Sequence, residues 1–356
     1  MKSIKNILFS VIAIVFAFCF VGCSPKNTTA DFTAFNTNVH VETYDKSLSA
    51  ETLNAVKKIL NNLEAKYSVT AENSFTARFN ALDANGTLTA DDETVFLFNR
   101  ALTFGALTGG KFDFTVYPLM KAWRFSPEYP VNDFTPPTQM QIDECLGAVG
   151  YGKVYVQGSE VGKTADGVQI DLGGFLKGYA TDLIAKKLKQ VGVTQGYVNV
   201  GGSSLYLFDV DTLDVRHPEN RYSSVLTVKK GLKTVCVSTS GTYERSYEYM
   251  GATYTHIINP SSGVPADTGI LSATVICRDG AFADAMTTAL CLSSFDANNT
   301  ECEFNRLVAK ITETDAEAVV FAVYNKNGYK AIVTNCQDAA GFKINDASYN
   351  LIKLNV

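Results

Sequence analysis

The segment of residues 171–182, with the sequence DLGGFLKGYATD, constrains the fold of this chain more than any other. Asp171 closes the largely apolar run 168–170. Two glycines, Lys177 and a third glycine follow, and a helix is predicted over 178–192. Glycine lets the backbone approach a neighbouring group or ligand closely. The free N–H groups of a helix N-terminus and the charge of a lysine both attract anions. The segment therefore predicts a backbone grip on a phosphorylated ligand.

Hydrophobic periodicity predicts both helices and strands along residues 31–356. Strand-like runs at hairpin-like intervals fill the second half of the chain. We also expect a short strand over 112–116 and pairing between 153–156 and 168–171. This mixture predicts an α+β fold, or a mixed-sheet α/β fold. Helical spacing occurs at 51–67, 91–108 and 282–292.

Residues 1–22 have the pattern of an export signal. Two lysines precede the apolar run 7–21, which is shorter than the roughly 20 residues that a membrane-spanning helix needs. A glycine directly before Cys23 resembles a bacterial lipoprotein signal that is cleaved before Cys23, whose thiol then carries lipid. Residues 23–30 then form a polar tether and 31–356 one domain. An uncleaved anchor, or ordinary secretion with an incidental cysteine, are the alternatives.

This reading places the protein in the bacterial cell envelope. It is lipid-anchored to a membrane and faces the periplasm or another extracytoplasmic side. The formal net charge is −5 and the chain has no basic run, which argues against nucleic acid as a partner.

The cysteines beyond position 23 are scattered and form no C-x-x-C pair. This argues against a zinc site or a dense disulfide framework, although one disulfide stays open. These cysteines are Cys145, Cys236, Cys277, Cys291, Cys302 and Cys336.

Asp284 and Thr288 are four residues apart in the predicted helix 282–292, so they share one face. A carboxylate and a hydroxyl are hard oxygen ligands that suit Mg²⁺. Taken alone, the pair is weak evidence for a metal, because an aspartate in a helix is usually a solvated or capping residue.

His256 ends a strand-like run and precedes a turn rich in proline, serine and glycine at 259–265. A neutral imidazole there could take a proton from a hydroxyl nucleophile. The alternative is a hydrogen-bonded structural histidine. Glycine turns at 199–203 and 238–245 could bring further backbone N–H groups or hydroxyls to a ligand, or could be plain hairpin turns.

Taken together, these segments resemble the ApbE family, the FAD:protein FMN transferases. The resemblance runs from about Asp31 to the C-terminus, and four separate motifs occur in the order of the family. These motifs lie at 171–182, 197–205, 237–266 and 279–290, and weaker matches lie at 66–80 and 109–123.

The resemblance implies an ApbE-like fold, with mixed, largely antiparallel sheets flanked by helices. It also implies that a Thr or Ser hydroxyl of an exported flavoprotein attacks the FMN-side phosphorus of FAD, that AMP leaves, and that FMN stays on the acceptor as a phosphoester. Mg²⁺ supports this reaction. Asp284 and Thr288 match the metal ligands of the family, with the carbonyl of Gly174 as a third.

The resemblance gives the remaining candidates their roles. His256 matches the base for the acceptor hydroxyl, and Lys177 matches a catalytic residue that neutralises pyrophosphate charge in the transition state. Partners are FAD as substrate, the acceptor protein, and the membrane through Cys23. The expected FAD contacts are Tyr67, Lys111, Phe112, Asp113, Asp171, Lys177 and Ile257.

Two positions depart from the family pattern. Phe35 replaces a methionine that touches FAD, and Asn259 replaces an aspartate close to His256. The alternatives to a transferase are a Mg²⁺-dependent FAD pyrophosphatase, which releases FMN and AMP, and a non-catalytic FAD-binding lipoprotein.

Overall fold

The computed structural model describes residues 27–129, 134–229 and 231–356. The predicted signal of residues 1–22 and the predicted lipidation site Cys23 lie outside these residues. Strand β1 begins at Thr28, so the folded domain includes the end of the stretch predicted as a tether. Among the described helices, none is long and apolar enough to cross a membrane.

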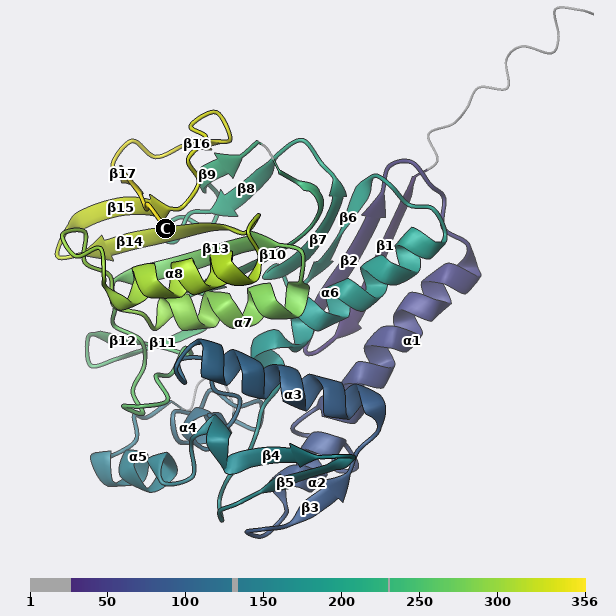
Figure 1. Ribbon diagram of the computed structural model, residues 1–356, viewed down its shortest axis with the longest axis vertical. Helices are drawn as coiled ribbons and strands as arrows, with labels where there is room; N and C mark the ends of the chain where they lie inside the picture. The colour runs from purple at the N-terminus through teal and green to yellow at the C-terminus, as the bar shows by residue number, and fades with distance from the viewer. Residues whose placement is uncertain (1–26, 130–133, 230) are drawn as a thin grey trace, which may run out of the picture.

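One mixed sheet organises the fold (Figure 1). Every neighbouring pair in it is antiparallel except β15 and β17. The predicted α+β class with largely antiparallel sheets is therefore confirmed. Across the sheet, the described strands are β1 (Thr28–Ala34), β2 (Thr37–Thr43), β6 (Gly196–Val200), β7 (Ser204–Asp209), β10 (Lys233–Gly241), β13 (Ile270–Cys277), β14 (Val319–Lys326), β15 (Tyr329–Thr334) and β17 (Asn350–Lys353).

Helices cover one face of this sheet (Figure 1). Helix α1 begins at the N-cap Ser49 and buries Val56, Leu60 and Leu63, a helical spacing that forms one apolar stripe. Helix α7 is buried along almost its whole length, which fits its alanine-rich sequence. The covering helices are α1 (Ala50–Tyr67), α6 (Gly173–Gln190), α7 (Gly280–Cys291) and α8 (Glu303–Thr314).

A small sheet covers part of the opposite face. Alternate residues of the large sheet point to the two sides, so Cys236 packs with the helices while its neighbour Val237 packs with the small sheet. This second core includes Ile276 and Phe321. The small sheet has the order β16 (Phe342–Ile344), β9 (Ser224–Val228) and β8 (Leu213–Arg216).

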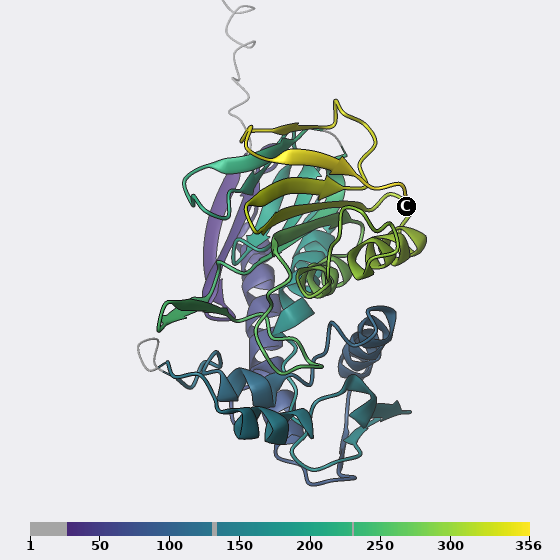
Figure 2. The same cartoon turned by 90° about the vertical axis from the view of Figure 1, so that its left-hand side faces the viewer.

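A separate lobe lies beneath one end of the large sheet (Figures 1 and 2). A hairpin that belongs to neither sheet, β11 (Ser246–Tyr249) with β12 (Ala252–Thr255), lies between this lobe and the body. The lobe contains α2 (Phe75–Asn80), β3 (Thr87–Thr89), α3 (Asp92–Leu107), α4 (Tyr117–Ala122), α5 (Gln139–Leu146), the short 3-10 helix η1 (Tyr151–Lys153), β4 (Val154–Gln157) and β5 (Glu160–Lys163).

Two predicted strands of this lobe are wrong. The stretch 112–116 forms no strand, because the buried carboxylate of Asp113 accepts the N–H of Thr115 and the chain then enters α4. The partner of β4 is β5, which follows a tight turn, and not residues 168–171. The backbone of Ile170 instead forms two hydrogen bonds with the side chain of Asn80. Its N–H donates to Oδ1 of Asn80 at 2.7 Å, and its carbonyl accepts from Nδ2 of Asn80 at 3.0 Å.

The glycine-rich segment also differs from the prediction. Helix α6 begins at Gly173 and not at residue 178, so the first glycines lie in its opening turn. Further along, Gly178 meets Gly280 at the start of α7. A Cβ added at Gly178 would lie 1.9 Å from the carbonyl oxygen of Gly280. These glycines therefore allow two helix backbones to touch.

We predict that Gly178→Ala lowers the free energy of unfolding by about 2 kcal/mol or more, because overpacking at a backbone contact forces α6 and α7 apart. The matched control is Gly152→Ala, where an added Cβ meets no atom within 4 Å. Urea unfolding of both variants measures the difference. Equal stability of the two variants would contradict the close contact.

Candidate active site

The contact between α6 and α7 brings a lysine and a buried aspartate together. The backbone N–H of Gly178 donates to Oδ2 of Asp284 at 3.1 Å, and Nζ of Lys177 lies 3.6 Å from the same oxygen. Asp284 is only 4 % exposed. Burial raises the pKa of its carboxyl, while Lys177, the Gly178 N–H and the hydroxyl of Ser204 act in the opposite direction.

Hydroxyl groups from two strands lie against α7, that of Ser204 at the Asp284 carboxylate and that of Ser240 at Thr287 and Thr288. Ser204 begins β7, and Ser240 lies near the end of β10. Oγ of Ser240 lies 2.8 Å from Oγ1 of Thr287 and 3.4 Å from Oγ1 of Thr288. Because α7 packs on β10, its successive turns present Asp284 and Thr288 to the same polar end of the sheet.

These donors fit a hard divalent cation. Asp284 and Thr288 supply oxygens from α7, and Gly174 lies in the facing first turn of α6. In the described part of the chain, no group of three or more His, Cys, Asp or Glu side chains is arranged to hold a metal. A single carboxylate with neutral oxygens matches the way Mg²⁺ is often bound, with water and substrate phosphates as its other ligands.

Asp171 shapes the start of α6. Its Oδ1 accepts the N–H of Gly173 at 2.8 Å, and the carbonyl of Gly173 accepts from Nζ of Lys177 at 3.0 Å. Burial raises the pKa of Asp171, and the Gly173 N–H, Lys177 and Arg245 counteract it. The positive charge of Lys177 therefore lowers the pKa of two carboxyl groups, those of Asp171 and Asp284.

His256 follows β12 and is held in one orientation. Its Nδ1 lies 3.1 Å from the carbonyl of Arg245, which only accepts, so Nδ1 carries the proton and Nε2 keeps the lone pair. Burial, with the charges of Arg245 and Lys177, lowers the pKa of His256 to about 4. The imidazole is therefore neutral at pH 7 and able to accept a proton at Nε2.

Aromatic side chains hold the hairpin that leads to His256. The ring of Phe125 lies 6.3 Å from the imidazole and 5.0 Å from Tyr247, and Trp123 lies 5.4 Å from Tyr254, all between centroids. The guanidinium of Arg245 also donates to the carbonyl of Phe125. The lobe thus fixes the strand that carries the histidine.

The turn after His256 uses the amide of Asn259, at the position where the resemblance predicts a carboxylate. Oδ1 of Asn259 accepts the N–H of Ser261 at 2.9 Å, and the backbone N–H of Asn259 donates to Val264. An amide oxygen makes the same turn as a carboxylate oxygen would, but it adds no charge next to the histidine.

Three predicted FAD contacts direct their side chains into the protein. Nζ of Lys111 lies 3.0 Å from the carboxylate of Glu303, and Phe112 packs on the ring of Phe175. Both oxygens of Asp113 are taken, one by Thr115 and one by the N–H of Tyr151. The backbone N–H groups of Lys111 and Phe112 also donate within the protein, both to Thr108, so contact of residues 111–113 with a flavin stays a prediction.

Tyr67 and Ile257 are also buried. The hydroxyl of Tyr67 lies 3.0 Å from Oγ1 of Thr94, its ring is 2 % exposed, and burial raises its pKa to about 12. Ile257 is 5 % exposed, and its carbonyl accepts from Ala266. The hydroxyl of Tyr67 is thus directed to Thr94, and its contact with a flavin stays a prediction.

Phe35, the other departure from the family pattern, lies in the tight turn between β1 and β2. Both Phe35 and Asn36 have a positive φ, 55° and 56°, and the N–H of Phe35 donates to Oε1 of Glu64 at 3.0 Å. The ring is partly buried against the main core.

Sequence reasoning missed three residues that support the site, namely Arg245, Ser240 and Asp182. The carboxylate of Asp182 accepts the N–H groups of Gly280 and Ala281 at 3.0 and 3.3 Å, so it fixes the N-terminus of α7. Burial raises its pKa to about 6. All three lie inside the motifs 171–182 and 237–266. Ser240 directly precedes a glycine, whereas Asp182 lies within α6 and only its place in the motif could have indicated it.

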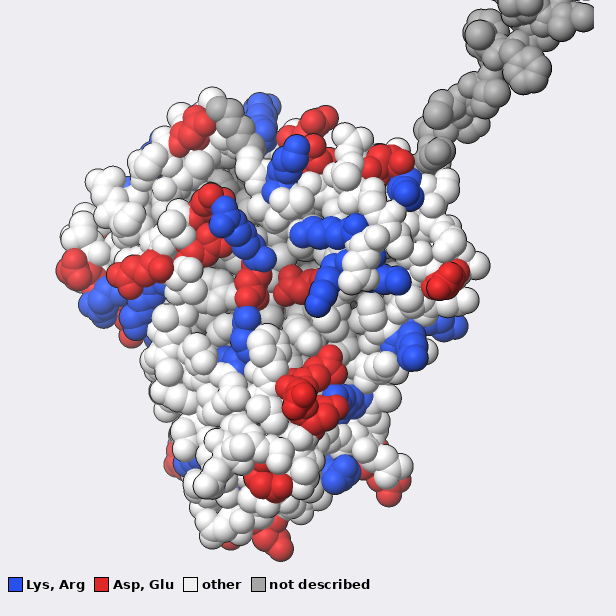
Figure 3. All heavy atoms as spheres, turned by 45° about the vertical axis from the view of Figure 1, so that its right-hand side comes forward, with Lys and Arg blue, Asp and Glu red and all other residues white. Residues whose placement is uncertain are grey.

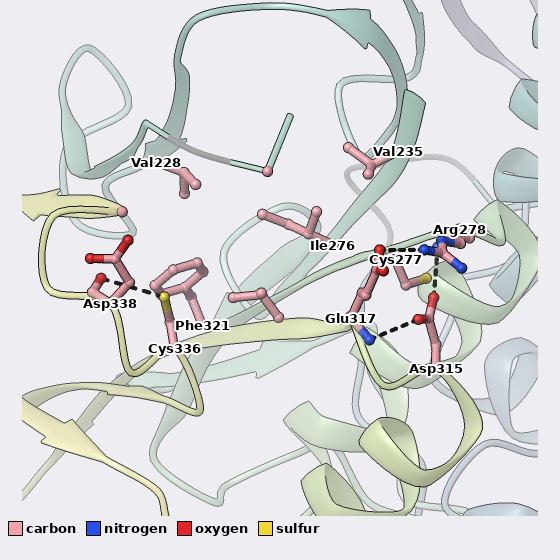
Figure 4. A pocket seen from close by; sticks show the side chains of 13 residues that line it. Val228, Val235, Ile276, Cys277, Arg278, Asp315, Glu317, Phe321, Cys336 and Asp338 are labelled. Carbon is pink, nitrogen blue, oxygen red and sulfur yellow. Dashed lines mark hydrogen bonds and ion pairs between the residues drawn. The ribbon is translucent and has the colours of Figure 1, made fainter. Parts of the chain in front are cut away.

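Two hollows lie apart from Asp284 and His256. One, of about 700 Å³, is lined by Tyr179, Lys186 and Lys189 of α6 together with Arg100, and Figure 3 shows basic side chains around it. The other, of about 240 Å³, opens between the large and small sheets (Figure 4).

In the second hollow, apolar residues such as Ile276 and Phe321 form the wall. Arg278 pairs with Glu317, and its N–H donates to Asp315 (Figure 4). The charges at this hollow are therefore satisfied within the protein.

Comparison with known proteins gives a consistent set of relatives. Residues 35–308 match the model of the ApbE family. The FAD:protein FMN transferase of Vibrio cholerae is 25% identical over 266 residues, which cover 73% of this chain and 79% of that protein. The FAD:protein FMN transferase of Escherichia coli K12 is 28% identical over 296 residues, with 77% and 83% covered.

A solved structure agrees with these relatives. The crystal structure of the ApbE protein from Thermotoga maritima matches the fold with a TM-score of 0.73 and 27% identity, covering 84% of this chain and 94% of that one.

We predict that His256 makes the protein less stable as the pH falls from about 6.5 to about 4. In the unfolded chain the imidazole binds a proton near its ordinary pKa of 6.5, whereas in the folded protein it stays neutral down to about 4. The stability is therefore fully present above pH 6.5 and declines below it. Urea midpoints at pH 7.5 and 5.0 should fall more in the wild type than in His256→Gln. Parallel declines would contradict the lowered pKa.

Proposed function

Because the chain belongs to the ApbE family, we propose that it is an FAD:protein FMN transferase. One observation carries this proposal. The buried carboxylate of Asp284 lies beside the ammonium of Lys177 at one polar end of the sheet. The charge of the same lysine helps to lower the pKa of His256, which is neutral at pH 7. Phosphoryl transfer needs positive charge at the phosphate and a base for the nucleophile, and these residues supply both.

In the proposed reaction, the hydroxyl oxygen of a Thr or Ser side chain attacks the FMN-side phosphorus of FAD. The bond from this phosphorus to the bridging oxygen breaks, and AMP leaves with that oxygen and its electron pair. The hydroxyl proton passes to Nε2 of His256, which the Arg245 carbonyl keeps in the accepting tautomer. The product is a phosphoester of FMN on the acceptor.

We further propose that Mg²⁺ is the cofactor. Asp284, Thr288 and the carbonyl of Gly174 would hold it, and when bound it supplies Lewis-acid stabilisation of phosphate charge. Lys177 contributes a second positive charge from the opening turn of α6. Asp171, which keeps this turn in shape through the N–H of Gly173, is a positioning residue for the FAD site.

The acceptor in this proposal is an exported flavoprotein. The protein itself is proposed to be a lipoprotein that is anchored through Cys23 and faces the extracytoplasmic side. The support for this part is the lysine-led apolar run that ends at Gly22 and Cys23.

A labelling assay tests the proposal and separates it from the alternatives. The protein is incubated with FAD, Mg²⁺ and an exported flavoprotein that carries a Thr acceptor, and flavin fluorescence on the acceptor is read after denaturation. Covalent label supports the transferase. FMN and AMP without label indicate the pyrophosphatase, and unchanged FAD indicates a binding protein; either result would overturn the proposal.

We predict that Asp284→Ala lowers the labelling rate by about a hundredfold or more, because metal stabilisation of phosphate charge contributes several kcal/mol. Asp143→Ala is the control, since this exposed aspartate lies on α5 in the separate lobe. The rate of label formation is measured for both variants. Full activity of Asp284→Ala would rule out the metal assignment.

We predict that His256→Ala lowers the labelling rate by about 10²–10⁴-fold, the usual contribution of a general base. The dissociation constant for FAD should change little, because the imidazole acts on the acceptor hydroxyl. Fluorescence titration with FAD measures binding separately from transfer. Equal losses in binding and in transfer would argue that His256 holds the substrate instead.

A further inference from the structure

We propose that Lys177 is the internal counter-ion of Asp284 in the metal-free protein, and that a divalent cation and the lysine ammonium exchange at this carboxylate. The exchange would free the ammonium to meet the substrate phosphates only when the metal is bound. This inference rests on the proposed function, because it concerns the proposed metal site, but it is tested without FAD.

The geometry carries the proposal. Nζ of Lys177 lies 3.6 Å from Oδ2 of Asp284, and the Asp284 side chain is 5 % exposed. Across residues 27–129, 134–229 and 231–356, no other Lys, Arg or His forms an ion pair with Asp284. The ammonium therefore lies at the carboxylate that is expected to bind the metal.

Burial explains why this pair exists without a metal. An ionised carboxylate removed from water is costly unless a charge or hydrogen-bond donors compensate it. Here the Gly178 N–H and Lys177 provide that compensation. The protein thus has a preformed anionic site that is neutralised from within.

Two cations cannot share this oxygen without repulsion. Like charges only a few ångströms apart repel each other at the effective dielectric constant of a protein. A bound metal therefore favours movement of the lysine, which has a flexible four-carbon stem. The Lys177 side chain is 27 % exposed, so solvent-accessible space is open to it.

The position of Lys177 indicates which groups the released ammonium would meet. Its Nζ lies 3.0 Å from the carbonyl of Gly173, whose N–H donates to Asp171 at 2.8 Å, so the ammonium lies between Asp284 and the turn that is proposed to bind FAD. Metal binding would thus prepare the lysine for the phosphates.

The first test measures Mn²⁺ affinity by electron paramagnetic resonance in the absence of FAD. Lys177→Met removes the competing charge and keeps an unbranched chain, so it should bind Mn²⁺ about tenfold more tightly than the wild type. Lys187→Met, on the last turn of the same helix, is the control and should bind like the wild type.

The second test uses the wild-type protein and so does not depend on a variant. Acetylation of Lys177 by an N-hydroxysuccinimide ester, followed by peptide mass spectrometry, should be slow without metal and several-fold faster with saturating Mg²⁺. Lys187 serves as the internal reference, and its rate should not change.

Equal or weaker Mn²⁺ binding by Lys177→Met, or a Lys177 acetylation rate that Mg²⁺ leaves unchanged or slows, would overturn the exchange. The labelling assay with FAD reports separately on the transferase. A protein that labels its acceptor but shows neither effect is a transferase without this exchange. If both effects are seen but the acceptor is not labelled, the exchange is supported and the proposed transferase function is overturned.

Discussion

The contact between Gly178 and Gly280 is the constraint on which the rest of the site depends. Two helix backbones come so close that a Cβ at either position would collide with the other helix, at 1.9 and 2.5 Å from a carbonyl oxygen. Because of this approach, the Gly178 N–H reaches Asp284. Asp182 secures the same junction by capping the start of α7. The glycines of α6 thus serve helix packing as much as approach to a ligand.

Around this junction, the site is assembled mostly from groups that the fold itself orients. Backbone N–H groups bind the two carboxylates, a backbone carbonyl sets the tautomer of His256, and strand ends provide the hydroxyls of Ser204 and Ser240. Side chains held by backbone groups have little freedom, which is the condition for preorganised electrostatic stabilisation. Lys177 differs from these groups, since its charge is carried at the end of a flexible four-carbon stem.

The sequence predicted those features that depend on local spacing. The helix that carries Asp284 and Thr288, the strand that precedes His256 and the α+β class follow from periodicity. The roles of these three residues came from the family resemblance and stay predictions. It failed where tertiary contacts override local pattern. Residues 112–116 look like a strand, but the Asp113 carboxylate takes backbone donors that a ladder would use. The start of α6 was placed too late because glycines are poor helix formers, a cost that packing against α7 outweighs.

The strand order of the large sheet has a consequence for how the chain folds. Strands β2 (Thr37–Thr43) and β6 (Gly196–Val200) are neighbours in the sheet. In the sequence, however, all of the lobe and α6 lie between them. Such distant pairing slows folding, since a long loop must close before the contact forms. Until residue 200 is available, the edge of β2 stays unpaired and open to other chains. The junction of α6 and α7 likewise joins Gly178 to Gly280, which are far apart in the sequence, so it also requires distant segments to meet.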